Sequence, residues 1–113
     1  MRFLATVLLL TAMTAGAQAP HKNLKVLKED QIRPVMGSMQ ASLGQRCNFC
    51  HVQGDNASDE NPKKLVARMM MEMVNDINAK FPDGKAHVSC YTCHRGKNMP
   101  DMVPPPATPP PAQ

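Results

Sequence analysis

Two five-residue runs constrain this 113-residue chain more than any other feature of its sequence. Residues 47–51 (CNFCH) and 90–94 (CYTCH) both read C-x-x-C-H. The pattern is typical of c-type haem attachment, because two nearby thiols can add to the two vinyl groups of one porphyrin while the histidine binds its iron. The two runs use all four cysteines of the chain. We therefore expect two covalently attached haem c groups, held by Cys47, Cys50 and His51 and by Cys90, Cys93 and His94.

Two other uses of a C-x-x-C pair remain open from the sequence. Two pairs can hold one zinc ion, but such pairs are usually about 15–20 residues apart, and the gap here is roughly double that. Zinc also gives no reason for a histidine to follow each pair. A redox-active disulfide is the second alternative, although no alternation of strands and helices surrounds either pair.

The chain has few residues for a conventional hydrophobic core. It contains no tryptophan, one tyrosine and three phenylalanines, and its length allows one domain at most. A domain of this size buries little surface on its own, whereas each porphyrin offers a large flat apolar surface to pack against. We therefore expect the protein without haem to be largely unfolded.

The net charge of +4 does not indicate a nucleic-acid-binding protein. Removal of an N-terminal segment that contains Arg2, and addition of about four haem propionates, bring the expected charge close to zero. Aromatic residues are not interleaved with the basic ones, as they are in proteins that bind single strands. The lysines and arginines are better suited to pairing with propionates or to steering redox partners.

Residues 1–19 have the features of a secretory signal peptide. Arg2 gives a positive start, and residues 3–12 form an apolar run that is too short to span a bilayer. Small residues follow, so cleavage is expected after Ala17 or Ala19. No cysteine follows the run to indicate a lipoprotein, and the mature chain is expected in the periplasm, free or peripheral to the membrane, without a transmembrane helix.

Residues 20–103 are expected to form the haem domain, in which local signals predict two main helices. Asp30 is expected to cap a helix over 31–43, and Asn61 to cap a helix over 62–80. Each is followed by a turn and then by a C-x-x-C-H run. The predicted fold is all-α, a small helical dihaem c-type cytochrome built from repeated units of Met-bearing helix, turn and C-x-x-C-H, with little or no sheet.

The ends of the domain and the faces of its helices are also predicted. The first helix should end at Gly44, the first haem-binding run should form a short helix over 47–52, and the proline-rich residues 104–113 should form a disordered tail. Apolar residues recur at helical spacing, which predicts one buried face on each helix. These residues are Ile32, Val35, Met36, Met39 and Leu43 on the first helix, and Leu65, Val66, Met69, Met70, Met73, Val74 and Ile77 on the second.

Three stretches of the chain resemble the cytochrome c subunit of photosynthetic reaction centres. They are Leu43-Gly44 before the first run, residues 67–73 (ARMMMEM) with Ile77-Asn78, and residues 88–96 (VSCYTCHRG). The resemblance extends from about residue 31 to residue 100 and is most specific around the second run. The subunit of that family carries four haems, so this chain resembles a two-haem version of it.

The resemblance also implies a sixth ligand for each iron. In the family a methionine eleven residues before the first cysteine binds one haem, and that position here is Met36. The first methionine of an M-x-x-M pair followed by I-N corresponds to Met70. We therefore expect Met36 to serve the haem at Cys47 and Met70 the haem at Cys90, with Met39 and Met73 in reserve. The other methionines are expected to fill apolar space.

The two remaining histidines are not the expected ligands. The family has a histidine between the long helix and the last haem-binding run, where it serves a different haem. His87 lies in this stretch but is much nearer to Cys90 than the pattern requires, so it is expected at the surface or near a propionate. A bis-histidine haem that uses His87 stays an alternative. His21 is expected to be solvated.

An iron with histidine and methionine ligands has no open position for a substrate and a raised potential. The expected function is therefore outer-sphere electron transfer between periplasmic or membrane-bound redox proteins, without enzymatic activity. Self-association that brings haems of neighbouring molecules together is a further expectation. Two alternatives stay open: a dihaem peroxidase-like enzyme, which needs a vacant iron and an acid–base residue, and a structural or sensory haem module of a larger complex.

Overall fold

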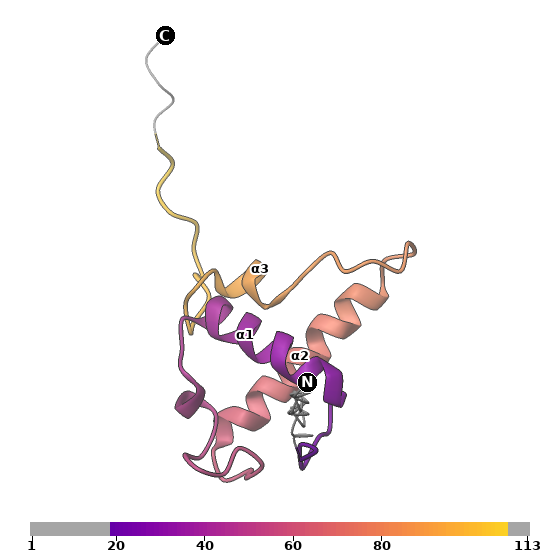
Figure 1. Cartoon of the computed structure of the whole chain (residues 1–113). Coiled ribbons are helices and arrows are strands. Elements are labelled where there is room, and N and C mark those ends of the chain that lie inside the picture. Colours follow the sequence, from indigo (N-terminus) through magenta and orange to yellow (C-terminus); the bar gives the residue numbers. More distant parts are fainter. Residues whose placement is uncertain (1–18, 109–113) are drawn as a thin grey trace, which may run out of the picture.

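The computed structural model describes residues 19–108, which form three α-helices joined by turns and loops (Figure 1). The helices are α1 (Ile32–Leu43), α2 (Pro62–Ala79) and α3 (Cys90–His94). A 3-10 turn, Glu29–Gln31, precedes α1, and a second one, Cys47–Phe49, follows it. Within these residues the extended pairing is limited to one isolated bridge between Val52 and Asp55. The all-α prediction is confirmed.

The first helix begins without the cap that the sequence predicts. Gln31, and not Asp30, occupies the N-cap position, and its side chain accepts a hydrogen bond of 2.9 Å from the backbone N–H of Lys28. Asp30 is part of the preceding 3-10 turn. The expected Asp30 cap is wrong because this turn, closed by the Lys28–Gln31 contacts, takes over the entry into the helix. The expected end is correct, since Gly44 follows Leu43 with φ of +62°.

The second helix begins and ends close to its predicted bounds. The side chain of Asn61 accepts a hydrogen bond of 3.0 Å from the backbone N–H of Lys63, and Pro62 occupies the first helical position. Proline is well placed there because the first N–H groups of a helix have no partner within the helix. The helix ends at Ala79, one residue before the predicted boundary.

The two haem-binding runs differ in local structure. The second run is the whole of α3, whereas the first forms only the 3-10 turn Cys47–Phe49. The predicted short helix over 47–52 is therefore wrong in extent. The backbone N–H of His51 still reaches the carbonyl of Cys47 at 2.9 Å, but the chain then turns into the bridge between Val52 and Asp55 instead of continuing the helix.

The C-terminal end of α1 is held against the segment that follows α3 (Figure 1). The backbone N–H of Gly96 donates a hydrogen bond of 2.8 Å to the carbonyl of Ser42. Ser42 is the one residue of the described part that is buried, with 3% of its surface exposed. This contact joins two segments that belong to different halves of the predicted repeat.

The apolar side chains of residues 19–108 surround two cavities instead of forming a closed core, and none of them is fully buried. Five of the seven residues of the predicted apolar face of α2 line the larger cavity. Leu65 and Met69 line neither cavity and are 51% and 52% exposed, because they lie to one side of the face that meets the cavity. Val66, Met73 and Ile77 are exposed as well, although they line the larger cavity. The predicted burial of these five residues is wrong. The five that line the larger cavity are Val66, Met70, Met73, Val74 and Ile77.

The termini lie largely outside the structure. The expected signal peptide falls almost entirely on residues 1–18, and the end of the proline-rich tail on residues 109–113, which are outside the described residues. Residues 103–108 are exposed and irregular. Between residues 19 and 108 no helix is both long and apolar enough to cross a membrane.

Candidate haem-binding sites

The histidines of the two C-x-x-C-H runs are held in the same way. Nδ1 of His51 lies 3.1 Å from the carbonyl oxygen of Asn56, and Nδ1 of His94 lies 3.0 Å from that of Lys97. A carbonyl can only accept, so Nδ1 of each ring is the donor in this contact, and in the neutral imidazole Nε2 is then the nitrogen with a free lone pair. Metal-binding histidines are oriented in this way, by a hydrogen bond from the second nitrogen. Both imidazoles therefore have the orientation that a metal-binding histidine adopts.

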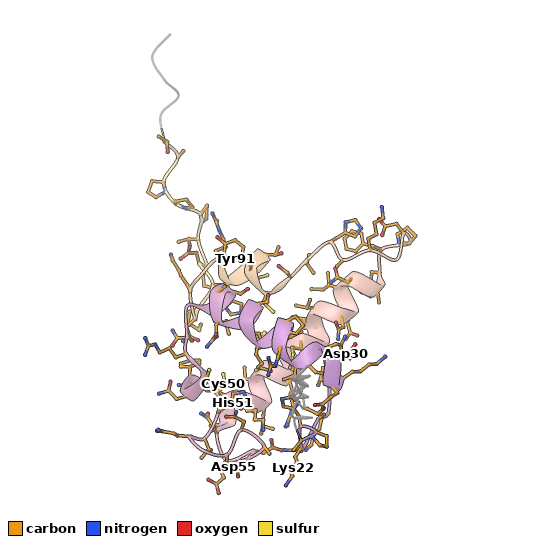
Figure 2. The ribbon with its side chains drawn as sticks, viewed as in Figure 1. Lys22, Asp30, Cys50, His51, Asp55 and Tyr91 are labelled. Carbon is orange, nitrogen blue, oxygen red and sulfur yellow. The ribbon has the colours of Figure 1, made fainter. Side chains whose placement is uncertain are left out.

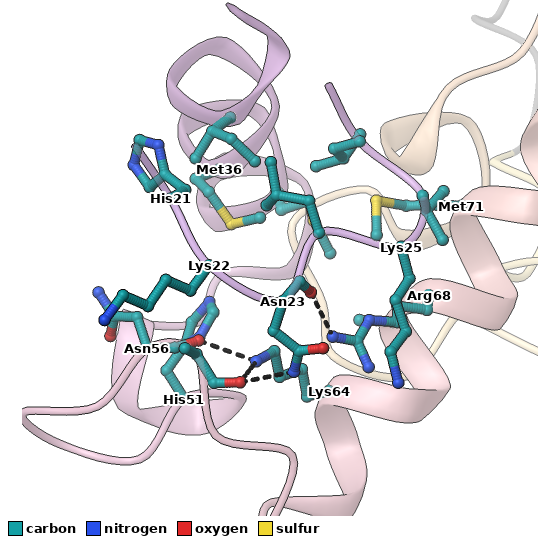
Figure 3. Close-up of a pocket in the computed structure, with 17 residues that line it drawn as sticks. His21, Lys22, Asn23, Lys25, Met36, His51, Asn56, Lys64, Arg68 and Met71 are labelled. Atoms are coloured by element: carbon teal, nitrogen blue, oxygen red, sulfur yellow. Dashed lines mark hydrogen bonds between the residues drawn. The ribbon is translucent and has the colours of Figure 1, made fainter. Parts of the chain in front are cut away.

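The first cavity brings His51 together with the expected methionine. It has a volume of about 190 Å³, and its lining includes His51, Met36 and Met39 (Figure 3). His51, the last residue of the first run, reaches it from just beyond the 3-10 turn, and the two methionines reach it from α1. The residues predicted for the iron at Cys47 thus share one cavity, although Cys47 itself does not line it. Cys47 is exposed, and its Sγ lies 3.1 Å from Nε2 of Gln40.

The second cavity is larger, with a volume of about 340 Å³. Its lining includes Cys90, Cys93 and His94 from α3, opposite methionines of α2. Both Met70 and Met73 are among these, so the geometry leaves open which of the two is the ligand. Cys50, from the first run, also lines this cavity, and its burial raises the pKa of the thiol. Figure 2 shows Cys50 beside His51, with Tyr91 at the other end of the molecule on α3.

The two cavities share a wall. Three residues line both of them, namely Met39 of α1 and Ala67 and Met71 of α2. A thioether side chain adapts its shape readily to two apolar neighbours. The two cavities are therefore adjacent along this part of α1 and α2.

Two asparagines tie the ends of α2 to the two haem-binding runs, and the sequence analysis assigned neither this role. Besides capping α2, Asn61 donates from Nδ2 to the carbonyl of Phe49 at 3.0 Å, inside the first run. Asn78 donates from Nδ2 to the carbonyl of Val88 at 2.9 Å. Its Oδ1 accepts from the backbone N–H groups of His87 at 2.8 Å and Val88 at 2.9 Å. The I-N pair of the family resemblance was the one available signal for Asn78.

A cluster of charges lies beside the first cavity, and no short motif predicts it. The carboxylate of Asp59 pairs with Arg68 at 3.0 Å and with Lys25 and Lys64 at 3.3 Å each. The pKa of Asp59 is held well below its usual range, chiefly by a hydrogen bond from the Asn23 side chain and then by these cations. The cluster fixes residues 19–28 across the start of α2.

Lys64 completes this arrangement. Its Nζ donates to three consecutive carbonyls, of Asn56 at 2.8 Å, Ala57 at 2.9 Å and Ser58 at 2.8 Å, two of which are drawn in Figure 3. The carbonyl of Asn56 is also the one that holds Nδ1 of His51. The loop that orients the first histidine is therefore itself held by a cation of α2.

The other two histidines lie in different surroundings. His87 bonds through Nε2 to Asp83 at 2.9 Å, stacks on Phe81 with 4.1 Å between ring centroids, and lines neither cavity. Its expected place at the surface agrees with this. The side chain of His21 is 44% exposed, which agrees with its expected solvation, but its Nδ1 also bonds to Glu29 and it lines the first cavity. That contact lowers the pKa of the Glu29 carboxyl.

The residues present fit haem c better than the alternatives. Each cavity combines a poised imidazole with thioethers on a largely apolar surface, which suits a porphyrin with a six-coordinate iron. No group of three or more histidine, cysteine or acidic side chains gathers as a metal site within residues 19–108. The two C-x-x-C pairs are not brought into one zinc site, and their four cysteines are free thiols there.

Comparison with known proteins agrees with this fit. The family model of the photosynthetic reaction centre cytochrome c subunit matches residues 9–110. The chain belongs to this family. It is 39% identical over 94 residues to the photosynthetic reaction center cytochrome c subunit of Thermochromatium tepidum, which covers 74% of this chain and 22% of that protein.

Two further relatives carry the same kind of name. The corresponding subunit of Roseobacter denitrificans is 33% identical over 97 residues, covering 74% of this chain and 26% of its own length. Cytochrome c-554 of Chloroflexus aurantiacus is 41% identical over 61 residues, covering 50% of this chain and 15% of its own length. The chain thus spans about a quarter or less of these proteins. Membership implies covalently bound haem c.

Proposed function

We propose that this protein is an exported dihaem c-type cytochrome that carries electrons between redox partners by outer-sphere transfer. The observation that supports it most directly is the matched pair of sites. In each, a C-x-x-C-H histidine held through Nδ1 shares a cavity with a methionine of a neighbouring helix. The family match supports haem as the cofactor.

The protein supplies ligands, orientation and shielding. His51 and His94 present Nε2 to the two irons, and Met36 and Met70 are the proposed ligands on the opposite faces. The cysteines attach the porphyrins, and the apolar lining excludes water. The bound haem supplies the one-electron chemistry, while its surroundings set the potential. With both axial positions taken, neither iron has room for a substrate.

The shared wall of the cavities supports internal electron exchange between the two haems. The residues between them would be Met39, Ala67 and Met71. Electrons would cross this shared wall directly, without a longer route through the protein. Electrons could then enter at one haem and leave at the other. The partners would be periplasmic or membrane-bound redox proteins, in keeping with the expected export of the chain and with the names of its relatives.

The test is the absorption spectrum of the exported protein, oxidised and reduced, with and without carbon monoxide. Mass spectrometry of the same sample counts the attached haems. Two haems, a sulfur-to-iron band when oxidised and no response to carbon monoxide would establish a saturated electron carrier. A prompt carbon monoxide shift would refute saturation and would favour the peroxidase-like or sensory alternative.

A further inference from the structure

The four histidines of the chain divide into two kinds by the nitrogen that is bonded. His51, His94 and His21 are each held through Nδ1, the first two by a carbonyl and His21 by a carboxylate. His87 is held through Nε2 instead. The first arrangement leaves Nε2 available, which is the nitrogen that the haem-binding histidines present to iron. By this criterion His21 belongs with the haem ligands.

The partner of His21 strengthens the comparison. Glu29 accepts from the backbone N–H of His21 at 3.1 and 3.2 Å, in addition to its contact with Nδ1. A carboxylate on the far nitrogen of a metal-binding histidine fixes the ring and makes it a stronger ligand. Among residues 19–108, Nε2 of His21 makes no hydrogen bond of its own.

His21 also lies at the right cavity. It lines the first cavity together with Met36 and His51, and all three are labelled in Figure 3. The segment that carries it is tied down at both ends. Glu29 holds His21 next to the start of α1, and Asn23 donates to the carbonyl of Ala57 at 2.7 Å while accepting from Arg68 at 3.2 Å.

We propose that His21 is a second distal ligand for the haem attached at Cys47 and Cys50, in exchange with Met36. This proposal rests on the proposed function. In the exchange the bond from iron to the sulfur of Met36 breaks and a bond from iron to Nε2 of His21 forms. No electron is transferred, and the proton on Nδ1 stays in the contact with Glu29. Methionine raises the potential of a haem relative to a second histidine, so the exchange would give this haem two potentials.

The experiment uses the full exported holoprotein and its variants Met36→Ala, Met36→Ala/His21→Ala and Met36→Ala/His87→Ala. With Met36→Ala we expect half of the sulfur-to-iron band to disappear while both irons stay low-spin and unresponsive to carbon monoxide. The potential of one haem should fall. Removal of His21 as well should make that haem high-spin and open to carbon monoxide. The His87 double variant is the matched control and should behave like Met36→Ala alone.

Two outcomes would overturn the proposal. If Met36→Ala alone binds carbon monoxide at one haem, His21 does not take the iron. If the His21 double variant stays low-spin, another residue binds the iron, and a fully retained sulfur band would identify that residue as a methionine, Met39 or Met71. A Met36→Leu variant repeats the comparison with the side-chain volume retained. Failure of the proposed function is distinct, because it would appear in the unmodified protein as a missing haem or a carbon monoxide shift.

Discussion

Replacement of Gly44 by alanine tests the junction on which the second site depends. A Cβ built on Gly44 lies 2.3 Å from the carbonyl oxygen of Gly96, against about 3.4 Å for an ordinary contact. One of the two segments must therefore move by about 1 Å. The Gly96 side is held by its N–H bond of 2.8 Å to Ser42, and it directly follows α3. The movement should weaken this bond.

Two separate costs add at this position. Gly44 has φ of +62°, where a residue with a side chain costs about 1–2 kcal/mol. Forcing an extra methyl group into a tight contact costs about 1–3 kcal/mol. We expect Gly44→Ala to lower the free energy of unfolding of the holoprotein by about 2–5 kcal/mol.

Gly84→Ala is the matched control. Gly84 has a similar φ of +68°, but its Cβ would meet nothing within 4 Å. Only the conformational cost applies, so we expect a loss of about 1–2 kcal/mol. Guanidinium denaturation, monitored by circular dichroism and haem absorbance, measures the loss of unfolding free energy in each of the two variants. Equal losses in the two variants would refute the reasoning, because the contact with Gly96 would then contribute nothing.

Three further predictions concern the sites themselves. Met70→Ala should leave the haem at Cys90 attached, open its distal face to carbon monoxide and lower its potential. Met69 is exposed and outside both cavities, so Met69→Ala should change neither the carbon monoxide response nor the potential. If Met70→Ala had the same haem potential as Met69→Ala, Met70 would not be the ligand. Asn78→Ala should lower the free energy of unfolding by about 1–3 kcal/mol, because it removes three hydrogen bonds to the backbone of His87 and of the half-buried Val88. The exposed Asn75→Ala should be nearly neutral in the same denaturation experiment. The lowered pKa of Asp59 means that its ion pairs stabilise the folded protein above pH ~4 and are lost as pH falls through that lowered pKa. Asp59→Asn should thus be less stable than the parent at neutral pH and converge with it in acid, and a constant difference across pH would contradict this.

Much of the architecture follows from signals that act over a few residues. The C-x-x-C-H spacing, the Asn61–Pro62 start of α2 and the glycine after α1 each depend on contacts within one helical turn. Helical periodicity also identified the face of α2 that meets the larger cavity, but not its burial, because Leu65, Val66, Met69, Met73 and Ile77 are all exposed. The errors at Asp30 and at the end of the first haem-binding run are also local, because a 3-10 turn and a bridge compete there with the helix.

The sequence by itself determined the order of the helices and the all-α class, and it predicts the cofactor-binding residues, because these depend on residue type and short spacing. Only the tertiary structure decided how the parts meet: the wall shared by the two cavities, the approach of Cys50 to the second cavity, the Asn78 bonds and the Asp59 cluster. His21 belongs to this second group. These contacts join residues that are distant in the chain, and their partners are chosen by packing and charge in three dimensions, which no short spacing encodes.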